Sequence, residues 1–211
     1  MMNMSEEVRT FRRLGNRLCL DFTNTIDDRF RGQQEELLLT YRDLVAWSQQ
    51  TGIAAAEEAQ HLLVEASKRP EEAEHVRQQA ISRRETIFRI FQAVVDGSEP
   101  DEQDMQQFNA ALSEAMSKAR IVAGKEHYLW DWSEKAPALD WILWPVWRST
   151  ADVLTSEEIH LVRQCASDDC SWLFLDTSKN HSRRWCDMQN CGNRAKVNRH
   201  YERKKQSINR I

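Results

Sequence analysis

Four of the five cysteines in this 211-residue chain lie in its last quarter, as two pairs with the same spacing. Four residues separate Cys165 from Cys170 and Cys186 from Cys191, and fifteen residues lie between the two pairs. Two short cysteine pairs, joined by a segment long enough for a β-hairpin, can place four thiolates around one Zn²⁺, with each sulfur about 2.3 Å from the metal. The chemistry that this spacing predicts is zinc binding.

Other states of the cysteines are compatible with the spacing alone. They could be ordinary reduced thiols, form two disulfides or hold a [2Fe–2S] cluster, and His160, His181 or His200 could replace one cysteine as a ligand. The chain begins without an apolar signal segment and contains no run of about 20 apolar residues. We therefore expect a cytoplasmic protein without a membrane partner, in which thiols stay reduced. The symmetric spacing favours zinc over iron–sulfur chemistry.

Four sulfur ligands would leave the zinc without an open coordination position for water or substrate. Catalytic zinc sites normally have three protein ligands, so we expect one structural zinc ion. The sequence also lacks a Gly-rich phosphate loop, a GxSxG elbow and an HExxH motif. We therefore expect no enzymatic activity and predict no catalytic residues.

Positive charge is concentrated around and beyond the second cysteine pair. Residues 178–211 contain ten basic and two acidic residues, a net charge of +8, whereas the whole chain carries −4. The remaining residues, 1–177, therefore carry −12. Such a basic segment favours a polyanionic partner such as DNA or RNA. Part of its charge could instead offset the thiolates around the zinc.

The segments around the cysteines predict how the ligands are positioned. Residues 160–164 suit a β-strand leading to the first pair, and residues 171–175 suit another because they are aromatic and apolar. Residues 176–182 have turn chemistry, and residues 183–186 are expected to return as the paired strand. Residues 194–206 contain no Gly or Pro and many helix formers. This order predicts a treble-clef-like zinc finger made of a knuckle, a β-hairpin and a C-terminal helix.

The predicted C-terminal helix has two unlike faces. At 100° per residue, one face is apolar and is expected to pack on the hairpin through Val197, Tyr201 and Ile208. The opposite face is basic and carries Lys196, Arg199 and Arg203. Like charges on one helix face repel each other, so the arrangement suits a face that follows phosphates. A solvated tail is the alternative.

Several side chains of the finger are candidates for contact with nucleic acid. The cations expected at phosphates are Lys179, Arg183, Arg184, Lys196, Arg199, Arg203 and Lys204. Asn193 and Arg194 could reach base edges, although Arg194 lies nearer the apolar side and could instead hydrogen-bond within the finger. Two other functions are open. RNA could stack on Trp172, Phe174 or Trp185, or the basic helix could grip an acidic protein as an interaction adaptor.

The same residues resemble a known family. The run from Cys170 to Asn180, together with the segment that holds Cys191-Gly192-Asn193-Arg194, resembles the CGNR zinc finger with all four ligands present. Residues 18–25, Leu-Cys-Leu-Asp-Phe-Thr-Asn-Thr, resemble the start of the ABATE domain. That domain precedes CGNR fingers in bacterial proteins described as stress-induced transcription regulators. The resemblance implies a bacterial regulator with a DNA-binding finger and a helical sensory or assembly domain.

The rest of the chain predicts a mainly α domain over residues 1–155, followed by the finger over residues 156–211. Helices are expected from apolar periodicity, from Pro at helix starts and from Gly97 as a helix end, over residues 41–50, 53–67, 70–97, 100–116 and 137–154. Residues 120–132 could form one β-hairpin. A homodimer is also open, since DNA regulators often bind as two-fold dimers.

Five of the eight tryptophans fall within one short stretch of the first domain. They are Trp130, Trp132, Trp141, Trp144 and Trp147. Such a group could line a pocket for a small-molecule effector, because aromatic rings give large apolar area with few rotatable bonds. The alternative is a hydrophobic core, since positions 141, 144 and 147 fit one buried helix face. Pro145 is expected to kink or interrupt that helix.

Overall fold

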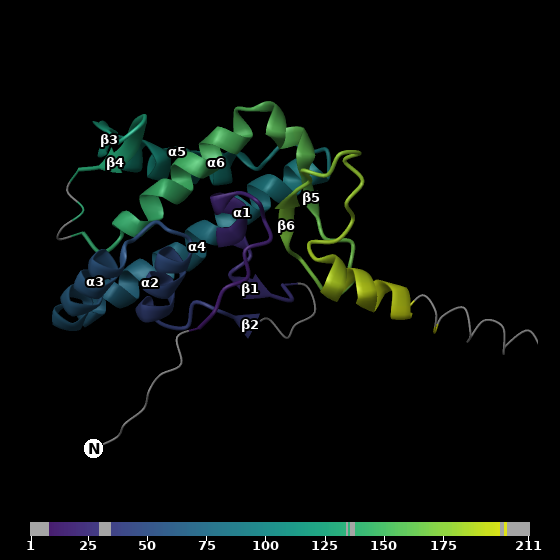
Figure 1. Ribbon diagram of the computed structural model, residues 1–211, viewed down its shortest axis with the longest axis horizontal. Helices are drawn as coiled ribbons and strands as arrows, with labels where there is room; N and C mark the ends of the chain where they lie inside the picture. Colours follow the sequence, from purple (N-terminus) through teal and green to yellow (C-terminus); the bar gives the residue numbers. More distant parts are fainter. Residues whose placement is uncertain (1–8, 30–34, 134, 136–137, 199–200, 202–211) are drawn as a thin grey trace, which may run out of the picture.

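The computed structural model describes residues 9–29, 35–133, 135, 138–198 and 201, and its described part is mainly helical. Figure 1 shows the long helix α4 running beneath α1, with the finger elements β5 and β6 at one end of the molecule. The helices in chain order are α1 (Leu18–Thr23), α2 (Tyr41–Gln50), α3 (Ala56–Lys68), α4 (Pro70–Val95), α5 (Glu102–Met116) and α6 (Trp144–Leu154). The predicted mainly α fold is confirmed.

The described part also contains three small antiparallel sheets, each of two strands. They pair β1 (Ile26–Asp27) with β2 (Glu35–Glu36), β3 (Ala119–Ala123) with β4 (Tyr128–Trp132), and β5 (Val162–Gln164) with β6 (Leu173–Leu175). The β3–β4 pair, in which Ile121 lies opposite Trp130, is the predicted hairpin. Short irregular turns of helix occur at η1 (Trp141–Leu143), η2 (Glu157–Leu161) and η3 (Met188–Gly192). Among the described residues, no helix is both long and apolar enough to cross a bilayer.

Local sequence signals explain most helix boundaries. Thr40 and Asp43 form a capping box at the start of α2, and Pro70 occupies the first turn of α4, where its missing N–H leaves no bond unmade. Gly97 follows α4 with φ of +71°, a conformation that glycine adopts without strain. Pro145 differs from its predicted role, because it lies in the first turn of α6 and starts that helix rather than kinking it.

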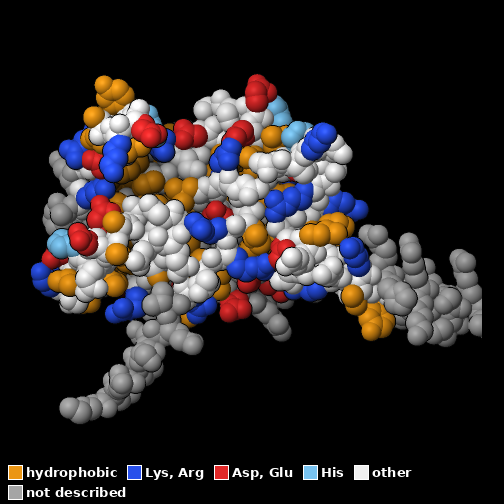
Figure 2. All heavy atoms as spheres, viewed as in Figure 1, with side chains coloured by type: hydrophobic (Ala, Val, Ile, Leu, Met, Phe, Trp, Pro, Cys, Tyr) orange, Lys and Arg blue, Asp and Glu red, His pale blue; other side chains and the backbone are white. Residues whose placement is uncertain are grey.

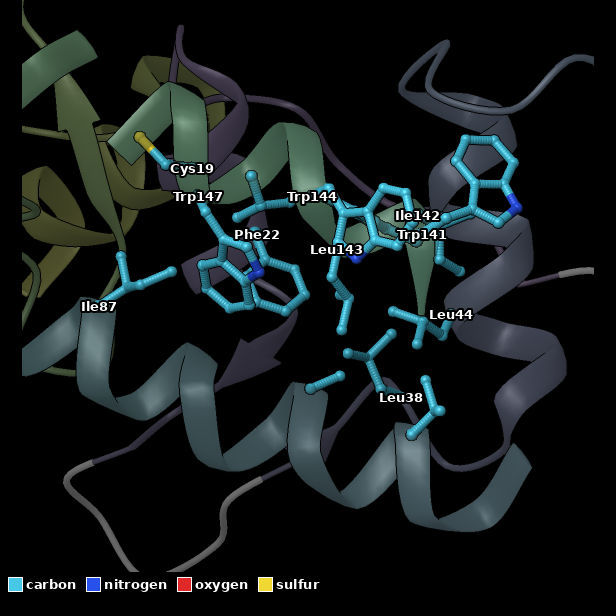
Figure 3. Close-up of a cluster of buried hydrophobic side chains, with 14 of the residues drawn as sticks. Cys19, Phe22, Leu38, Leu44, Ile87, Trp141, Ile142, Leu143, Trp144 and Trp147 are labelled. Atoms are coloured by element: carbon cyan, nitrogen blue, oxygen red, sulfur yellow. The ribbon is translucent and has the colours of Figure 1, made fainter. Parts of the chain in front are cut away.

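The predicted aromatic cluster is mostly hydrophobic core. Trp132, Trp144 and Trp147 are almost completely buried, and Figure 3 shows Trp147 beside Phe22 above α4. The ring centroids of Trp132 and Trp144 are 6.0 Å apart in a tilted arrangement. Trp130 instead lies on the exposed side of β4, with the Arg148 guanidinium 5.1 Å from its ring centroid. The buried members therefore stabilise the core around α6, which packs on α1 and α5. Of the five tryptophans, only Trp141 lines the cavity next to α3.

Helix α1 carries the stretch that resembles the ABATE domain, and its apolar members enter the core. Cys19 and Phe22 are fully buried, and burial raises the pKa of the Cys19 thiol to about 12, so this cysteine behaves as a small apolar residue. Asp21 accepts a hydrogen bond from the Gly15 backbone N–H at 2.8 Å. A Cβ on Gly15 would lie 2.7 Å from the Asp21 nitrogen, so this close approach requires glycine.

Replacing Asp21 with asparagine is expected to remove a pH dependence of stability. Burial raises the pKa of Asp21 from 3.8 to about 6, so the folded state binds more protons than the unfolded state between these values. The wild-type chain should therefore lose stability as pH rises through this range, and D21N, which keeps the acceptor oxygen, should not. Above pH ~6 the variant should be more stable by on the order of 2 kcal/mol.

Denaturant unfolding of both proteins at several pH values measures this effect. The difference in unfolding free energy should grow between about pH 4 and pH 6 and then stay constant. Taking the difference between the two proteins cancels the pH dependence of zinc binding, which they share. A constant difference across the whole range would contradict the assigned titration.

Candidate metal centre

The chain brings the four predicted ligands into one cluster at the end of the β5–β6 hairpin. Cys165 follows β5, Cys170 lies shortly before β6, Cys186 lies in a loop and Cys191 lies in η3. Their sulfur atoms all lie within 4.8 Å of one another, with Cys186 Sγ 3.7 Å from Cys170 Sγ and 3.6 Å from Cys191 Sγ. Four sulfurs about 2.3 Å from one zinc ion are about 3.8 Å apart in a regular tetrahedron. The donor set and its spacing therefore fit one structural zinc.

Each cysteine pair is held by backbone hydrogen bonds of its own loop. Cys170 N–H donates to the Ser167 carbonyl at 3.0 Å, and Cys165 N–H donates to the Trp172 carbonyl at 2.9 Å. In the second loop the Asp187 side chain accepts from Gln189 N–H at 2.9 Å and caps η3. These bonds help to position the four ligand side chains.

The electrostatics of the cluster also favour a cation. The thiols of Cys170 and Cys186 hydrogen-bond to the sulfur of Cys165 and hold the pKa of Cys165 well below its ordinary value. The same contacts, with burial, raise the pKa of Cys186. A divalent cation at the centre of the cluster would compensate the negative charge of all four thiolates. The Arg194 guanidinium adds a hydrogen bond to Cys191 Sγ at 3.3 Å.

The strand pairing in the finger differs from the prediction. Residues 183–186 do not form a strand, and β6 pairs with β5 instead. The Asp176 carboxylate accepts hydrogen bonds from Ser178 N–H at 2.9 Å and from Arg183 N–H at 2.8 Å, which ties this segment into a loop. The Arg183 guanidinium donates to the carbonyls of Trp185 and Cys186. Side chains rather than a neighbouring strand therefore satisfy this part of the backbone.

The predicted nucleic-acid residues fall into three groups. Arg183 lies over the Phe174 ring at 4.4 Å, and Arg194 pairs with Asp169 at 3.2 Å, so both guanidinium groups are engaged within the finger. Asn193 donates its side-chain amide to the Gln189 carbonyl at 2.8 Å but remains exposed. Lys179, Arg184 and Lys196 are exposed and form no ion pair with a described residue, whereas the exposed Arg194 is paired. Arg199, Arg203 and Lys204 lie outside the described residues.

The apolar face of the C-terminal helix does not pack on the hairpin. The helical segment of residues 193–198 leads away from the finger in Figure 1, and Val197 and Tyr201 are 52% and 65% exposed. The predicted docking was wrong for these two residues, and Ile208 lies outside the described part. The reason is that β6 is already covered, since Leu173, Phe174 and Leu175 are completely buried against the cysteine cluster and the first domain.

The finger is joined to the first domain by a set of polar bonds that the sequence did not reveal. The Asn24 side chain donates to the Leu173 carbonyl at 2.8 Å and accepts from the Leu173 N–H at 2.9 Å. The Trp172 indole N–H donates to the Ile26 carbonyl at 3.0 Å, and Arg12 pairs with Asp187. A sequence signal for this contact is the polar residue Asn24 directly after the apolar residues of α1.

These features define a protein in which a four-cysteine zinc finger is fastened to a helical domain. The CGNR zinc finger family matches residues 162–204, and the ABATE family, whose description is "Putative stress-induced transcription regulator", matches residues 16–157. Since the second match spans more than half of the chain, the chain belongs to the ABATE family. A search of curated proteins found no matching relative. The resemblance seen in the sequence and the predicted zinc cofactor are both confirmed.

Proposed function

We propose that this protein is a zinc-dependent, DNA-binding regulator of bacterial transcription that acts in a stress response in the cytoplasm. In this proposal the finger contacts the phosphate backbone and the first domain receives the signal. The observation that carries it is the set of exposed cations on the finger that form no ion pair with a described residue, Lys179, Arg184 and Lys196. Figure 2 shows Lys and Arg side chains around the finger.

The lysines of this set are available for phosphate because they are not used within the described structure. Lys179 lies in the turn after β6 and Lys196 in the C-terminal helical segment, and neither forms an ion pair with a described residue. Arg184 lies over the half-buried Trp185 ring, with its guanidinium 5.5 Å from the ring centroid. Cations without internal partners contribute little to the stability of the fold. Each contact with a phosphate, by contrast, releases a counterion and raises the affinity for DNA.

RNA binding by base stacking is the weaker alternative. Of the three aromatic residues considered for stacking, Trp172 is only 4% exposed and Phe174 is fully buried. A base could reach neither ring without unfolding the finger. The exposed cations would serve an acidic protein partner as well as DNA, so competition experiments must separate an adaptor from a DNA-binding protein.

Replacing Lys196 with alanine is expected to weaken DNA binding nearly equally for all duplex sequences and to reduce the salt slope of affinity by about 1, because one phosphate contact is lost. Fluorescence anisotropy at several salt concentrations measures both quantities. Lys125→Ala is the matched control, since Lys125 is equally exposed but lies at the β3–β4 turn, away from the finger. Equal affinity and slope for both variants would reject the proposed surface, and tighter binding of single-stranded RNA than of duplex DNA would favour the alternative.

A further inference from the structure

A cavity of about 410 Å³ lies between α3 and the chain segment that leads into η1. Its floor is apolar, because Leu62 from α3 and Leu139 and Trp141 from the segment are each at most 3% exposed and line the cavity. Figure 3 shows the indole of Trp141 apart from those of Trp144 and Trp147. Ligand sites in proteins commonly have volumes of ~300–1,000 Å³, so the space suits a small organic molecule.

The rim of the cavity is acidic. Helix α3 contributes Glu57, Glu58 and Glu65 to it, together with His61, while Lys135 is its single lysine. Glu58, Leu62 and Glu65 follow one another in α3 at spacings of four and three residues, so they lie on one face of the helix. The two carboxylates therefore lie beside the apolar floor that Leu62 helps to form. Glu65 is neutralised by Lys68, whose Nζ lies 2.7 Å away, so Glu57 and Glu58 supply the negative charge that repels anionic ligands and attracts cations.

The side chain of Lys135 marks the point at which a positive charge is best stabilised. Its Nζ lies 2.9 Å from Glu58 Oε1, 3.3 Å from Asp131 Oδ1 and 4.8 Å from the centroid of the Trp141 ring. Two carboxylates and an aromatic face are the groups that bind an ammonium ion in proteins. The chain thus places its own ammonium group in a cation site that opens onto an apolar cavity.

We propose that the cavity binds a small organic cation with an apolar body, and that the ammonium group of the ligand takes the position of Lys135 Nζ. The body of the ligand would cover Leu62, Leu139 and Trp141, which the Lys135 stem alone does not fill. Lys135 is partly exposed, and a long flexible side chain can turn into solvent at small cost. This inference goes beyond the proposed DNA binding and does not depend on it.

Calorimetric titration of the full-length, zinc-loaded protein with phenethylammonium tests the proposal. The neutral isostere 2-phenylethanol and the anion phenylacetate serve as matched probes of charge. The cation should bind at least about tenfold more tightly than the alcohol, and the anion should bind most weakly. No binding of the cation at millimolar concentration, or equal binding of cation and alcohol, would overturn the proposal.

Two variants locate the charged group. Lys135→Met should strengthen binding of the cation by about tenfold because the internal competitor for Glu58 is removed. In that Lys135→Met background, adding Glu58→Gln should weaken binding by about the same factor, because Glu58 then interacts with the ligand alone. Glu71→Gln, at an exposed position on α4, is the control and should leave the affinity unchanged. Weaker binding by the Lys135→Met variant, with its melting curve intact, would show that Lys135 holds the ligand and would contradict the displacement.

Discussion

Replacement of Cys186 with serine is expected to abolish zinc binding and to lower the melting temperature of the whole chain by about 10 °C or more. Cys186 is almost completely buried, and its sulfur lies within 3.7 Å of two other sulfurs, so its loss leaves the remaining thiols crowded without a metal. Structural zinc contributes on the order of 10 kcal/mol to the folding of small zinc domains. Much of that stabilisation should be lost.

The effect should reach the first domain because the two parts share a core. Leu173 and Leu175 are buried in the same hydrophobic cluster as α1 and α6, and Asn24 bonds to both backbone groups of Leu173. Zinc content per chain and thermal unfolding measure the two consequences. Cys19→Ala is the control, since Cys19 lies outside the metal cluster and its variant should keep one zinc. Full zinc retention by the Cys186→Ser variant would contradict the assigned ligand.

Replacement of Arg84 with methionine is expected to destabilise the chain by about 3–5 kcal/mol, because it removes one member of a buried ion pair. The side chain of Arg84 is 1% exposed, and its two terminal nitrogens lie 2.8 and 2.7 Å from the carboxylate oxygens of Glu36. Arg84 also donates to the Thr25 carbonyl at 3.2 Å. Without the guanidinium, the partly buried Glu36 carboxylate loses its cation and keeps only a backbone N–H donor, and methionine cannot replace the lost charge.

The same substitution at Arg89 on the same helix supplies the control for Arg84. Arg89 also forms a two-point ion pair, with Asp104, but its side chain is 53% exposed. Water reaches the Arg89 side chain, although its partner Asp104 is buried, so Arg89→Met should cost less than Arg84→Met. Denaturant unfolding compares the two, and equal losses of stability would show that burial does not set the energy of these pairs.

The sequence predicted the helices well because their ends carry local chemistry. Tyr41–Gln50 is α2 with the same bounds, and Pro70 and Gly97 mark α4 correctly. The four cysteines could be identified as candidate zinc ligands from their spacing, because two short cysteine pairs can surround one ion. In each case the deciding information lay within a few residues along the chain.

The errors concern contacts between distant parts of the chain. Residues 183–186 were expected to pair with β6, but β5 takes that position, and the Asp176 carboxylate binds the backbone of the returning segment instead. Arg183 and Arg194 count as basic residues in a charge sum, yet each is engaged within the finger. Net charge identifies the kind of partner, whereas burial and pairing decide which cations can reach it.

Val197 and Tyr201 show that apolar periodicity, like net charge, does not predict which residues are covered in the folded protein. Their helical spacing is that of a packed face, but the surface on which they would pack, strand β6, is occupied by the first domain through Leu14 and Asn24. A periodic pattern establishes that a face exists, and only the tertiary structure establishes whether it is covered.

The affinity of the full-length protein for a DNA duplex, measured with and without zinc over a range of salt concentrations, tests the central claim most directly. We expect the zinc-loaded protein to bind with a steep salt dependence, the chelated protein to lose binding, and added Zn²⁺ but not Mg²⁺ to restore it. Unchanged affinity and salt slope after complete removal of zinc would contradict the claim that the metal-held finger binds DNA.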